Sequence, residues 1–551
     1  MRFPVISELP VERVYTGAFR GYNHNRVIGG DEFYEMENMS SDEYPLLSPR
    51  RPRRKRMKLS KPHGLHAHEK LCWVDGTKFY YDGEEKGTVE DSDKQFVSMG
   101  ASVIIWPDKK IYNRISTRFE SLSIVDSSVS QIYVYSRGET LYQKRLKVYC
   151  DRASEFHNGD LVELFYTIYW EDEAIQGERP HGTITKTIFV KVVEEPENTL
   201  GYISIAYLEE IAEDVTKPEL QTFSGNVSRN IPDMDYICEH NNRLWGCSSA
   251  SNELFCSKLG DPFNWFTFNG DSQDSWSVNV GTQGAFTGIC VYQDSVLFFK
   301  EDCIHRLYGT RPQNYQISTI LCEGVEEGSS QSVRILDNTV FYKGRRGVNA
   351  FSGALPILVS SEFGTVRYTD AQAEGFWGKY YISMTALSGV QNREWSEAHP
   401  ELLVYDTAKG LWHKEGREKA SFFTVYDGEL LFIDENGELC AVGDGEDGMA
   451  EACVPWMVQT GRIQATAPDF KHISSIQIRA SLDETASIKA EIRYDGAGQW
   501  VTAAKKTAPK RMGYTIPVLP RRCEFFELRL SGTGDTRIQG IAYVMEQGSE
   551  L

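Results

Sequence analysis

The sequence contains none of the segments that direct a protein into or across a membrane. Its first residues, Met1–Glu8 (MRFPVISE), include no apolar stretch of the length that a signal peptide needs. No part of the chain reaches the ~18 consecutive apolar residues of a membrane-spanning helix. Helical periodicity is also scarce, and Tyr207–Val215 is the stretch that we expect to be helical. These absences favour a soluble, all-β protein made in the cytoplasm.

The common catalytic signatures are also missing. There is no phosphate-binding glycine loop, no HExxH motif and no GxSxG motif. Neighbouring acids such as Glu326-Glu327 and Glu209-Glu210 could form the carboxylate pair of a glycosidase. A chain with 78 acidic residues, however, contains such pairs by chance. We therefore expect no enzymatic activity, no cofactor and no metal.

One glycine-rich string, Gly443–Gly448 (GDGEDG), has the spacing of a dinucleotide-binding loop. Its three acids would repel a pyrophosphate, and Pro455 follows too closely for the helix that such a loop requires. The carboxylates of Asp444, Glu446 and Asp447 could instead bind calcium, or they could belong to a solvated loop between domains.

Cysteine and histidine occur outside zinc-binding patterns. Cys238, Cys247 and Cys256 are nine residues apart, which is not the spacing of zinc ligands. We expect the cysteines to be free, buried thiols, as in a protein made in a reducing compartment. Residues 63–68 hold three histidines, which could bind a metal or lie on an ordinary strand.

Acidic residues outnumber basic ones by 78 to 59, which gives a net charge of −19. Such an acidic chain as a whole is not suited to enclosing nucleic acid, although it could lie beside nucleic acid without binding it tightly. The block between residues 50 and 58 is, in contrast, strongly basic. It is either a solvated or internally paired strand or a contact for an anionic partner. The candidate contact residues are Arg50, Arg51, Arg53, Arg54, Lys55, Arg56 and Lys58.

A hairpin pattern returns five times between Tyr236 and Asp444. Each copy has an apolar strand, a tight polar turn such as Asp427-Gly428, and a second strand rich in aromatic residues. The copies start 54, 45, 40 and 48 residues apart. A β pattern that repeats every 40–50 residues or so is typical of the blades of a β-propeller.

Pairs of aromatic residues recur at matching places in three of these copies. Such pairs could stack against sugars, but we favour a role in the packed inner strands of the blades. The pairs are Phe298-Phe299, Phe341-Tyr342 and Tyr380-Tyr381.

The remaining segments complete an all-β architecture, namely a β-propeller with an inserted small β-barrel-like domain and a C-terminal β-sandwich. Short strands between turn residues mark the insertion and the C-terminal unit. The expected parts are an extended N-terminal arm (1–60), the first propeller blades (61–125), the inserted β-domain (126–225), the remaining blades (226–450) and the sandwich (455–551).

The arm and the order of these parts carry a resemblance to a known family. Phe19–Asn23 (FRGYN), Phe33–Met39 (FYEMENM) and Tyr44–Pro52 (YPLLSPRRP) resemble the start of tail proteins of short-tailed bacteriophages, in which a similar arm precedes a propeller. The family is the tail nozzle, or tail tubular protein B, together with the packaged-DNA stabilisation proteins.

The resemblance implies a structural virion protein that forms a homohexameric ring at the distal end of the tail. Such a ring would retain the packaged DNA and guide its ejection, with the DNA passing without tight binding. Its partners would be the portal- or adaptor-side tail proteins, with tail fibres as a further candidate. The protein would be made in the host bacterial cytoplasm and reside in the virion. The alternative is a receptor-binding or carbohydrate-processing β-propeller of a tail or cell-surface complex.

Overall fold

The computed structural model describes residues 11–136, 144–171, 181–194, 201–216, 220–391, 394–464, 471–496, 499–507, 512–516, 518 and 522–547. Over these ranges α1 (Glu209–Val215), within the segment expected to be helical, is the only α-helix, and strands dominate. None of the described helices is long and apolar enough to cross a membrane. The chain divides into two compact units, Met1–Asp75 with Phe299–Ile304 and Ile320–Leu551, and Gly76–Phe298 with His305–Thr319.

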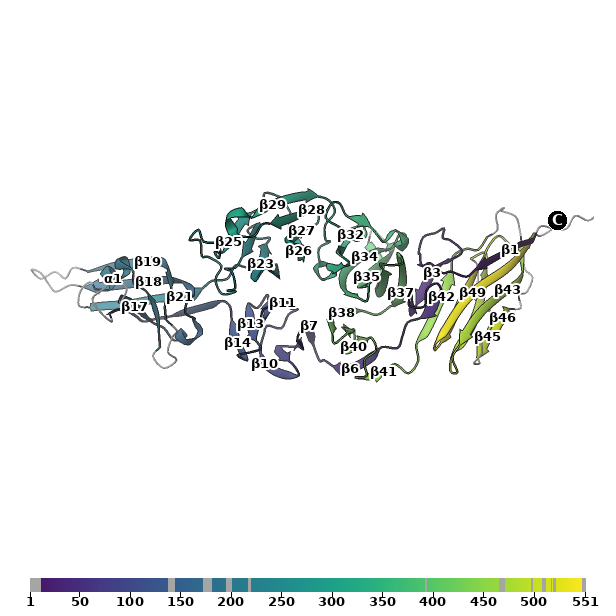
Figure 1. Cartoon of the computed structure of the whole chain (residues 1–551), viewed down its shortest axis with the longest axis horizontal. Helices are drawn as coiled ribbons and strands as arrows, with labels where there is room; N and C mark the ends of the chain where they lie inside the picture. Colours follow the sequence, from purple (N-terminus) through teal and green to yellow (C-terminus); the bar gives the residue numbers. More distant parts are fainter. Residues whose placement is uncertain are drawn as a thin grey trace, which may run out of the picture. The chain divides into compact units, whose positions relative to one another are not determined.

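Seven antiparallel sheets in the described residues are the blades of a β-propeller, which confirms the predicted fold class (Figure 1). In blades 3 to 7 the first two strands are the five hairpins of the sequence repeat. In chain order the blades are β7 (Pro62–His68), β8 (Lys70–Asp75), β9 (Lys78–Tyr81) and β10 (Glu84–Thr88); β11 (Gln95–Met99), β12 (Ser102–Trp106), β13 (Lys110–Asn113) and β14 (Arg118–Ser121); β22 (Tyr236–His240), β23 (Arg243–Ser248), β24 (Glu253–Cys256) and β25 (Trp276–Asn279); β26 (Phe286–Tyr292), β27 (Ser295–Lys300), β28 (Cys303–Tyr308) and β29 (Gln316–Leu321); β30 (Arg334–Leu336), β31 (Thr339–Gly344), β32 (Gly347–Phe351) and β33 (Ile357–Leu358); β34 (Arg367–Phe376), β35 (Lys379–Gln391), β36 (Glu394–Asp406) and β37 (Leu411–Gly416); and β38 (Ala420–Tyr426), β39 (Glu429–Asp434) and β40 (Glu438–Val442), joined by β6 (Arg54–Lys58) and β41 (Met449–Ala450).

The hairpins form because their turn residues accept an unusual backbone conformation. Asn241-Asn242 and Asp427-Gly428 have positive φ at both positions. This combination defines the tight turn whose twist matches that of the flanking strands, and Asn, Asp and Gly adopt it at the least steric cost. The aromatic pairs of the second strands are buried, and none of the six residues is more than 6% exposed. Their role is therefore packing within the blades, as we favoured from the sequence.

Blade 7 contains strands from two distant parts of the chain. β6, from the N-terminal arm, lies antiparallel to β40, with Met57 opposite Leu439, and also pairs with β41. The strand thus completes a blade that β38, β39 and β40 begin. The second half of the basic block, Arg54–Lys58, is consequently part of a sheet.

The inserted domain consists of two sheets around its own apolar core. Alternate residues of the long strand β18, including Val162, Leu164 and Ile168, point into this core and are fully buried. This period of two is what a strand with one buried face requires. The first sheet has the order β15 (Ile124–Val129), β21 (Leu220–Arg229), β18 (Leu161–Glu171) and β19 (His181–Lys191), and the second has the order β16 (Gln131–Ser136), β17 (Lys144–Tyr149) and β20 (Tyr202–Ala206).

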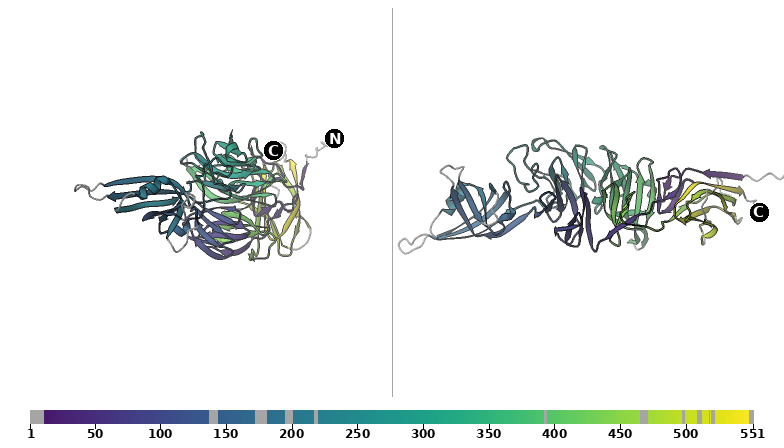
Figure 2. Two further views of the ribbon diagram at one scale, coloured as in Figure 1. Left: turned by 60° about the vertical axis from the view of Figure 1, so that its left-hand side comes forward. Right: turned by 60° about the horizontal axis from the view of Figure 1, so that its bottom comes forward.

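The C-terminal sandwich, expected over residues 455–551, also contains strands of the N-terminal arm. In Figure 2 the purple N-terminal strands run beside the yellow C-terminal ones. One sheet has the order β1 (Val11–Thr16), β49 (Thr536–Gln547), β43 (Lys471–Leu482) and β46 (Met512–Ile516), with β47 (Arg522–Cys523) also on β43; the other has the order β2 (Gly21–Tyr22), β3 (Glu32–Glu37), β42 (Pro455–Thr460), β48 (Phe526–Thr533), β44 (Ser487–Tyr494) and β45 (Val501–Thr507).

A single apolar cluster joins the arm, blades 5 and 6 and the sandwich. The arm contributes Phe19, Tyr22, Phe33, Met36 and Met39, each at most 4% exposed. Burial of a large apolar side chain stabilises a fold by ~1.5–3 kcal/mol. The arm is therefore an integral part of this unit's core.

Candidate functional site

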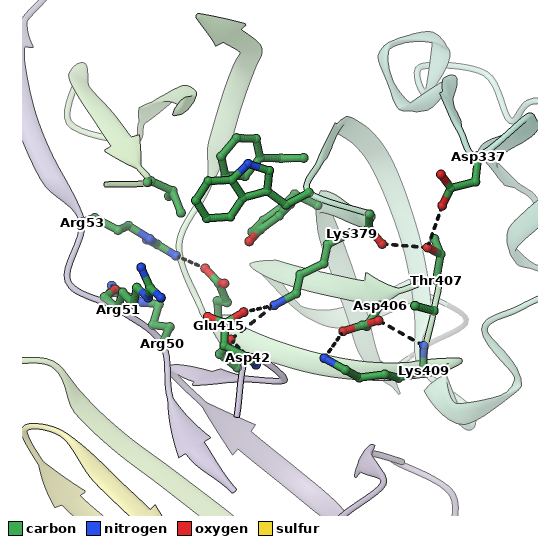
Figure 3. A pocket seen from close by; sticks show the side chains of 18 residues that line it. Asp42, Arg50, Arg51, Arg53, Asp337, Lys379, Asp406, Thr407, Lys409 and Glu415 are labelled. Atoms are coloured by element: carbon green, nitrogen blue, oxygen red, sulfur yellow. Dashed lines mark hydrogen bonds and ion pairs between the residues drawn. The ribbon is translucent and has the colours of Figure 1, made fainter. Parts of the chain in front are cut away.

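A cavity of about 410 Å³ lies where the N-terminal arm passes the turns of blades 5 and 6 (Figure 3). Three turns contribute, namely those between β30 and β31, between β34 and β35, and between β36 and β37. Arm residues between 40 and 53 form another part of its wall. We call this cavity the arm pocket. All of its lining residues belong to the same compact unit.

Trp377 is the most unusual residue of the arm pocket. Its side chain is 63% exposed. Its ring stacks on Phe376, with the centroids 4.5 Å apart and the planes inclined by 19°. The φ angles of Trp377 and Gly378 are +48° and +70°, so both residues form the tight turn of the β34–β35 hairpin. The turn thus presents a large aromatic ring to solvent beside the cavity.

The corresponding turns of four other blades use polar residues in this position. Asn241, Gln293, Asp337 and Asp427 lead the turns of blades 3, 4, 5 and 7, all with positive φ. A bulky side chain in this conformation costs roughly 1–2 kcal/mol, and a strained residue that the fold does not require is a pointer to function. Packing and backbone geometry therefore explain the presence of Trp377 less well than that of any other residue in the pocket.

Two cation–carboxylate pairs line the arm pocket (Figure 3). Lys379 Nζ lies 2.5 Å from Asp42 Oδ1. Asp406 Oδ2 accepts hydrogen bonds from Ser41 Oγ at 2.6 Å and from Lys409 Nζ at 3.0 Å. The Lys379–Asp42 pair and the hydrogen bond from Ser41 connect the arm to blade 6, and together these contacts fix the carboxylates in place.

Both carboxylates are held in the charged form. Burial alone would raise the pKa of Asp42, but the hydrogen bond and the charge of Lys379 lower it below its ordinary value. For Asp406 burial again opposes ionisation, and the hydrogen bonds from Ser41 and Lys409 lower the pKa overall. The pocket therefore offers anionic acceptors and ammonium donors beside an aromatic ring.

Most basic residues of the arm, the predicted contacts for an anionic partner, are paired with acids of the same unit. Arg53 is nearly fully buried and contacts Glu415 at 2.8 Å and also Glu418. Burial would lower the pKa of Arg53, but these two carboxylates raise it above its ordinary value. The other pairs are Arg50 with Glu451, Arg51 with Asp444, Lys55 with Asp434, and Arg54 and Arg56 with Glu429.

The arm pocket brings together only some of the residues that the sequence singled out. Arg50, Arg51 and Arg53 line it, whereas Lys58 is exposed at the end of β6. Trp377, Asp42 and Asp406 were not singled out, although an aromatic residue at a hairpin-turn position is a signal that sequence reasoning can use.

The other candidate sites have ordinary structural surroundings. The glycine-rich string after β40 leads into the short strand β41, and no helix of the described residues follows it. Its Asp444 pairs with Arg51 at 2.5 Å. None of the eleven cysteines, all of which lie in the described residues, forms a disulfide, and seven of them are buried. Among the described residues, no group of three or more His, Cys, Asp or Glu side chains is arranged to hold a metal ion.

Comparison with known proteins gives a likeness of fold. No family model and no curated protein matches the sequence. Among solved structures, Hsv2 of Kluyveromyces lactis is 9% identical over 69% of this chain and 100% of its own, with a TM-score of 0.26. The exo-β-1,3-galactanase of Phanerochaete chrysosporium, solved with galactose, is 10% identical over 56% of this chain and 94% of its own, with a TM-score of 0.22. At such identities only the fold is comparable.

These structures correct one expectation from the sequence. We expected no enzymatic activity because the common catalytic motifs are missing. Glycoside hydrolases, including the galactanase, are nevertheless among the solved structures that the chain matches. The absence of those motifs was therefore the wrong basis for excluding an enzyme, because glycan-cleaving enzymes need only suitably placed carboxylates.

Proposed function

We propose that this chain binds glycans in the arm pocket, as a receptor-binding or carbohydrate-processing propeller of a tail or cell-surface assembly. The observation that carries the proposal is Trp377, an exposed aromatic ring in a strained turn beside a polar cavity. Sugars combine apolar ring faces with many hydroxyl groups, so an aromatic platform flanked by charged hydrogen-bonding groups suits them.

The volume and the fixed polar groups of the pocket support this proposal. Binding sites for small ligands commonly measure ~300–1,000 Å³ and place a few polar groups in fixed positions. The arm pocket measures about 410 Å³, and its carboxylates are held by Lys379, Lys409 and Ser41. Because these groups are already positioned, little ordering free energy is lost when a ligand binds.

The proposal is tested by glycan-array binding of the full chain, followed by calorimetric titration of any bound oligosaccharide. We expect Trp377→Ala to weaken binding by about tenfold or more, while Trp377→Phe keeps part of the affinity. Phe268→Ala removes another exposed aromatic ring, outside the pocket, and should leave binding unchanged. Equal affinity of Trp377→Ala and the unchanged protein would contradict the proposal.

Turnover is measured with the same oligosaccharides by the release of new reducing ends. If Asp42 or Asp406 takes part in cleaving the glycosidic bond, the Asn variant of that residue should lose turnover and keep most of its affinity for the oligosaccharide. Binding without turnover would assign the pocket to recognition. Either result is compatible with a glycan site, and the comparison of variants decides which role the carboxylates have.

A second candidate function is the tail-nozzle role, which the resemblance of the arm suggests. The observation that favours it is the burial of Phe19, Phe33 and Met39, which belong to the resembling segments, in the common core of the arm, blades 5 and 6 and the sandwich. The order of an arm, a propeller with an insertion, and a sandwich is also that of the family. In this role a ring of copies would retain packaged DNA, guide its ejection and bind portal- or adaptor-side tail proteins.

The mass of the purified assembly under native conditions tests the nozzle role. The resemblance implies six copies in a closed ring, which forms when head-to-tail contacts between identical subunits close on themselves. A stable monomer at micromolar concentration, together with no binding to isolated phage tails, would argue against this role. That outcome would leave the glycan proposal intact.

A further inference from the structure

The inserted domain has an outer sheet face that is rich in tyrosine. In the sheet of β16, β17 and β20, the alternate residues Ile132, Leu146, Val148, Ile203 and Ile205 are buried in the domain core. The residues between them therefore lie on the opposite, outer face. This face carries Tyr133, Tyr135, Tyr149, Tyr202 and Lys147, and we call it the tyrosine face.

The tyrosines form a connected row across the three strands. The ring centroids of Tyr133 and Tyr149 are 5.8 Å apart and those of Tyr149 and Tyr202 are 5.3 Å apart. Tyr133 and Tyr135 remain 48% and 38% exposed. The fold does not require so many aromatic rings on a solvent-facing sheet, and exposed aromatic patches commonly mark binding surfaces.

Lys147 lies in the middle of the tyrosine face. Its Nζ is 4.1 Å from the ring centroids of both Tyr135 and Tyr202, and it donates a hydrogen bond to the Tyr202 hydroxyl at 2.8 Å. An ammonium group has three hydrogens to donate, so one hydrogen bond does not exhaust it. The two rings thus hold the cation in a fixed position on the face.

The charge of this sheet is opposite to that of the chain as a whole. The tyrosine face carries Arg145 and Lys147, and the described residues of β16, β17 and β20 include neither Asp nor Glu, although the chain has a net charge of −19. A cationic surface on an acidic protein favours an anionic partner at this place.

We propose that the tyrosine face binds an acidic polysaccharide, with Lys147 pairing with a carboxylate of the sugar chain and the tyrosines contacting its rings. Single-stranded nucleic acid fits less well, because bases need free aromatic faces on which to stack. Lys147 already covers a face of Tyr135 and of Tyr202. The hydroxyl groups of the tyrosines, with the ammonium group of Lys147 beside that of Tyr202, suit a polyhydroxylated, carboxylate-bearing chain.

Titration of the full chain with three probes tests this assignment. The probes are an oligogalacturonate, a neutral dextran oligomer of similar length, and an oligothymidine. We expect binding of the oligogalacturonate, weakening with added salt, and at least tenfold weaker binding of the other two. Lys147→Met should lower affinity for the oligogalacturonate about tenfold, and Lys147→Arg should retain most of it.

The control variants separate this site from the arm pocket. Lys191 is exposed at the end of β19, in the other sheet of the same domain, so Lys191→Met should bind as the unchanged chain does. Titrations repeated in the Trp377→Ala background remove the contribution of the arm pocket, so the effect of Lys147→Met is then measured at the tyrosine face alone. Near-ultraviolet circular dichroism confirms that each variant is folded.

Three results would overturn the proposal. The first is the absence of oligogalacturonate binding, and the second is affinity for oligothymidine as high as that for oligogalacturonate. The third is undiminished affinity in folded Lys147→Met. The second result would assign the tyrosine face to nucleic acid.

Discussion

At the scale of single residues, the strained turn of Trp377 predicts a conflict between stability and binding. Replacement by Asn puts a residue that tolerates positive φ at a position where φ is +48°. We expect Trp377→Asn to raise the free energy of unfolding by about 0.5–1 kcal/mol while removing glycan binding, because relief of strain is partly offset by loss of the contact with Phe376. Denaturant unfolding measures the first effect. A destabilised Trp377→Asn would show that the ring is kept for packing.

A second residue-scale prediction concerns acid sensitivity. Burial, and then the charge of Lys379, lowers the pKa of His413 from 6.5 to about 3. Between these values the unfolded chain binds a proton that the folded chain does not, so stability falls as the pH falls from 6.5 towards 3. His413 should contribute about 1.4 kcal/mol per pH unit to this slope. In His413→Gln the dependence of unfolding free energy on pH should be flatter, and an unchanged slope would refute the assignment.

At the scale of elements, strand β6 depends on its ion pairs. Arg54 and Arg56 both pair with Glu429, whose side chain is 4% exposed. Loss of both cations leaves a buried carboxylate without a charge partner, which costs about 3–5 kcal/mol. We expect the double variant Arg54→Ala, Arg56→Ala to lose that much stability in denaturant unfolding. Adding Glu429→Gln should restore part of it, whereas Lys58→Ala should change stability by less than about 0.5 kcal/mol.

The elements also show what local sequence could and could not predict. The blade hairpins were predictable because the turn residues and the alternation of apolar residues lie within about ten positions of each other. The pairings of β1 with β49, β3 with β42 and β6 with β40 join segments several hundred residues apart. A strand's own pattern shows which face is buried but not which partner it takes. For the same reason the arm pocket, which combines the arm with turns of blades 5 and 6, was not predicted.

At the scale of the whole molecule, the arm should be required for a stable sandwich. Without β1 and β3, the edges of β49 and β42 would expose unpaired backbone groups, which promotes aggregation. We expect residues 455–551 alone to aggregate or to unfold at a lower denaturant concentration than the same fragment fused to residues 11–49. Size-exclusion chromatography and denaturant unfolding compare the two fragments. Equal stability of the two fragments would mean that the sandwich is complete without the arm strands.

The net charge of −19 bears on how the whole molecule would meet DNA in the proposed tail role. Most arginines of the basic arm are paired with carboxylates, so few cations remain there to displace the counterions of a phosphate backbone. Contacts between cationic side chains and phosphates supply nearly all of the non-specific affinity of a protein for DNA, and this affinity falls steeply as the salt concentration rises. We expect double-stranded DNA to bind the purified chain only weakly, with a dissociation constant above about 10 μM at physiological salt. Fluorescence anisotropy with a labelled duplex measures it. Micromolar or tighter affinity would mean that the protein binds DNA tightly, which is incompatible with a channel through which the genome passes without being retained by its surface.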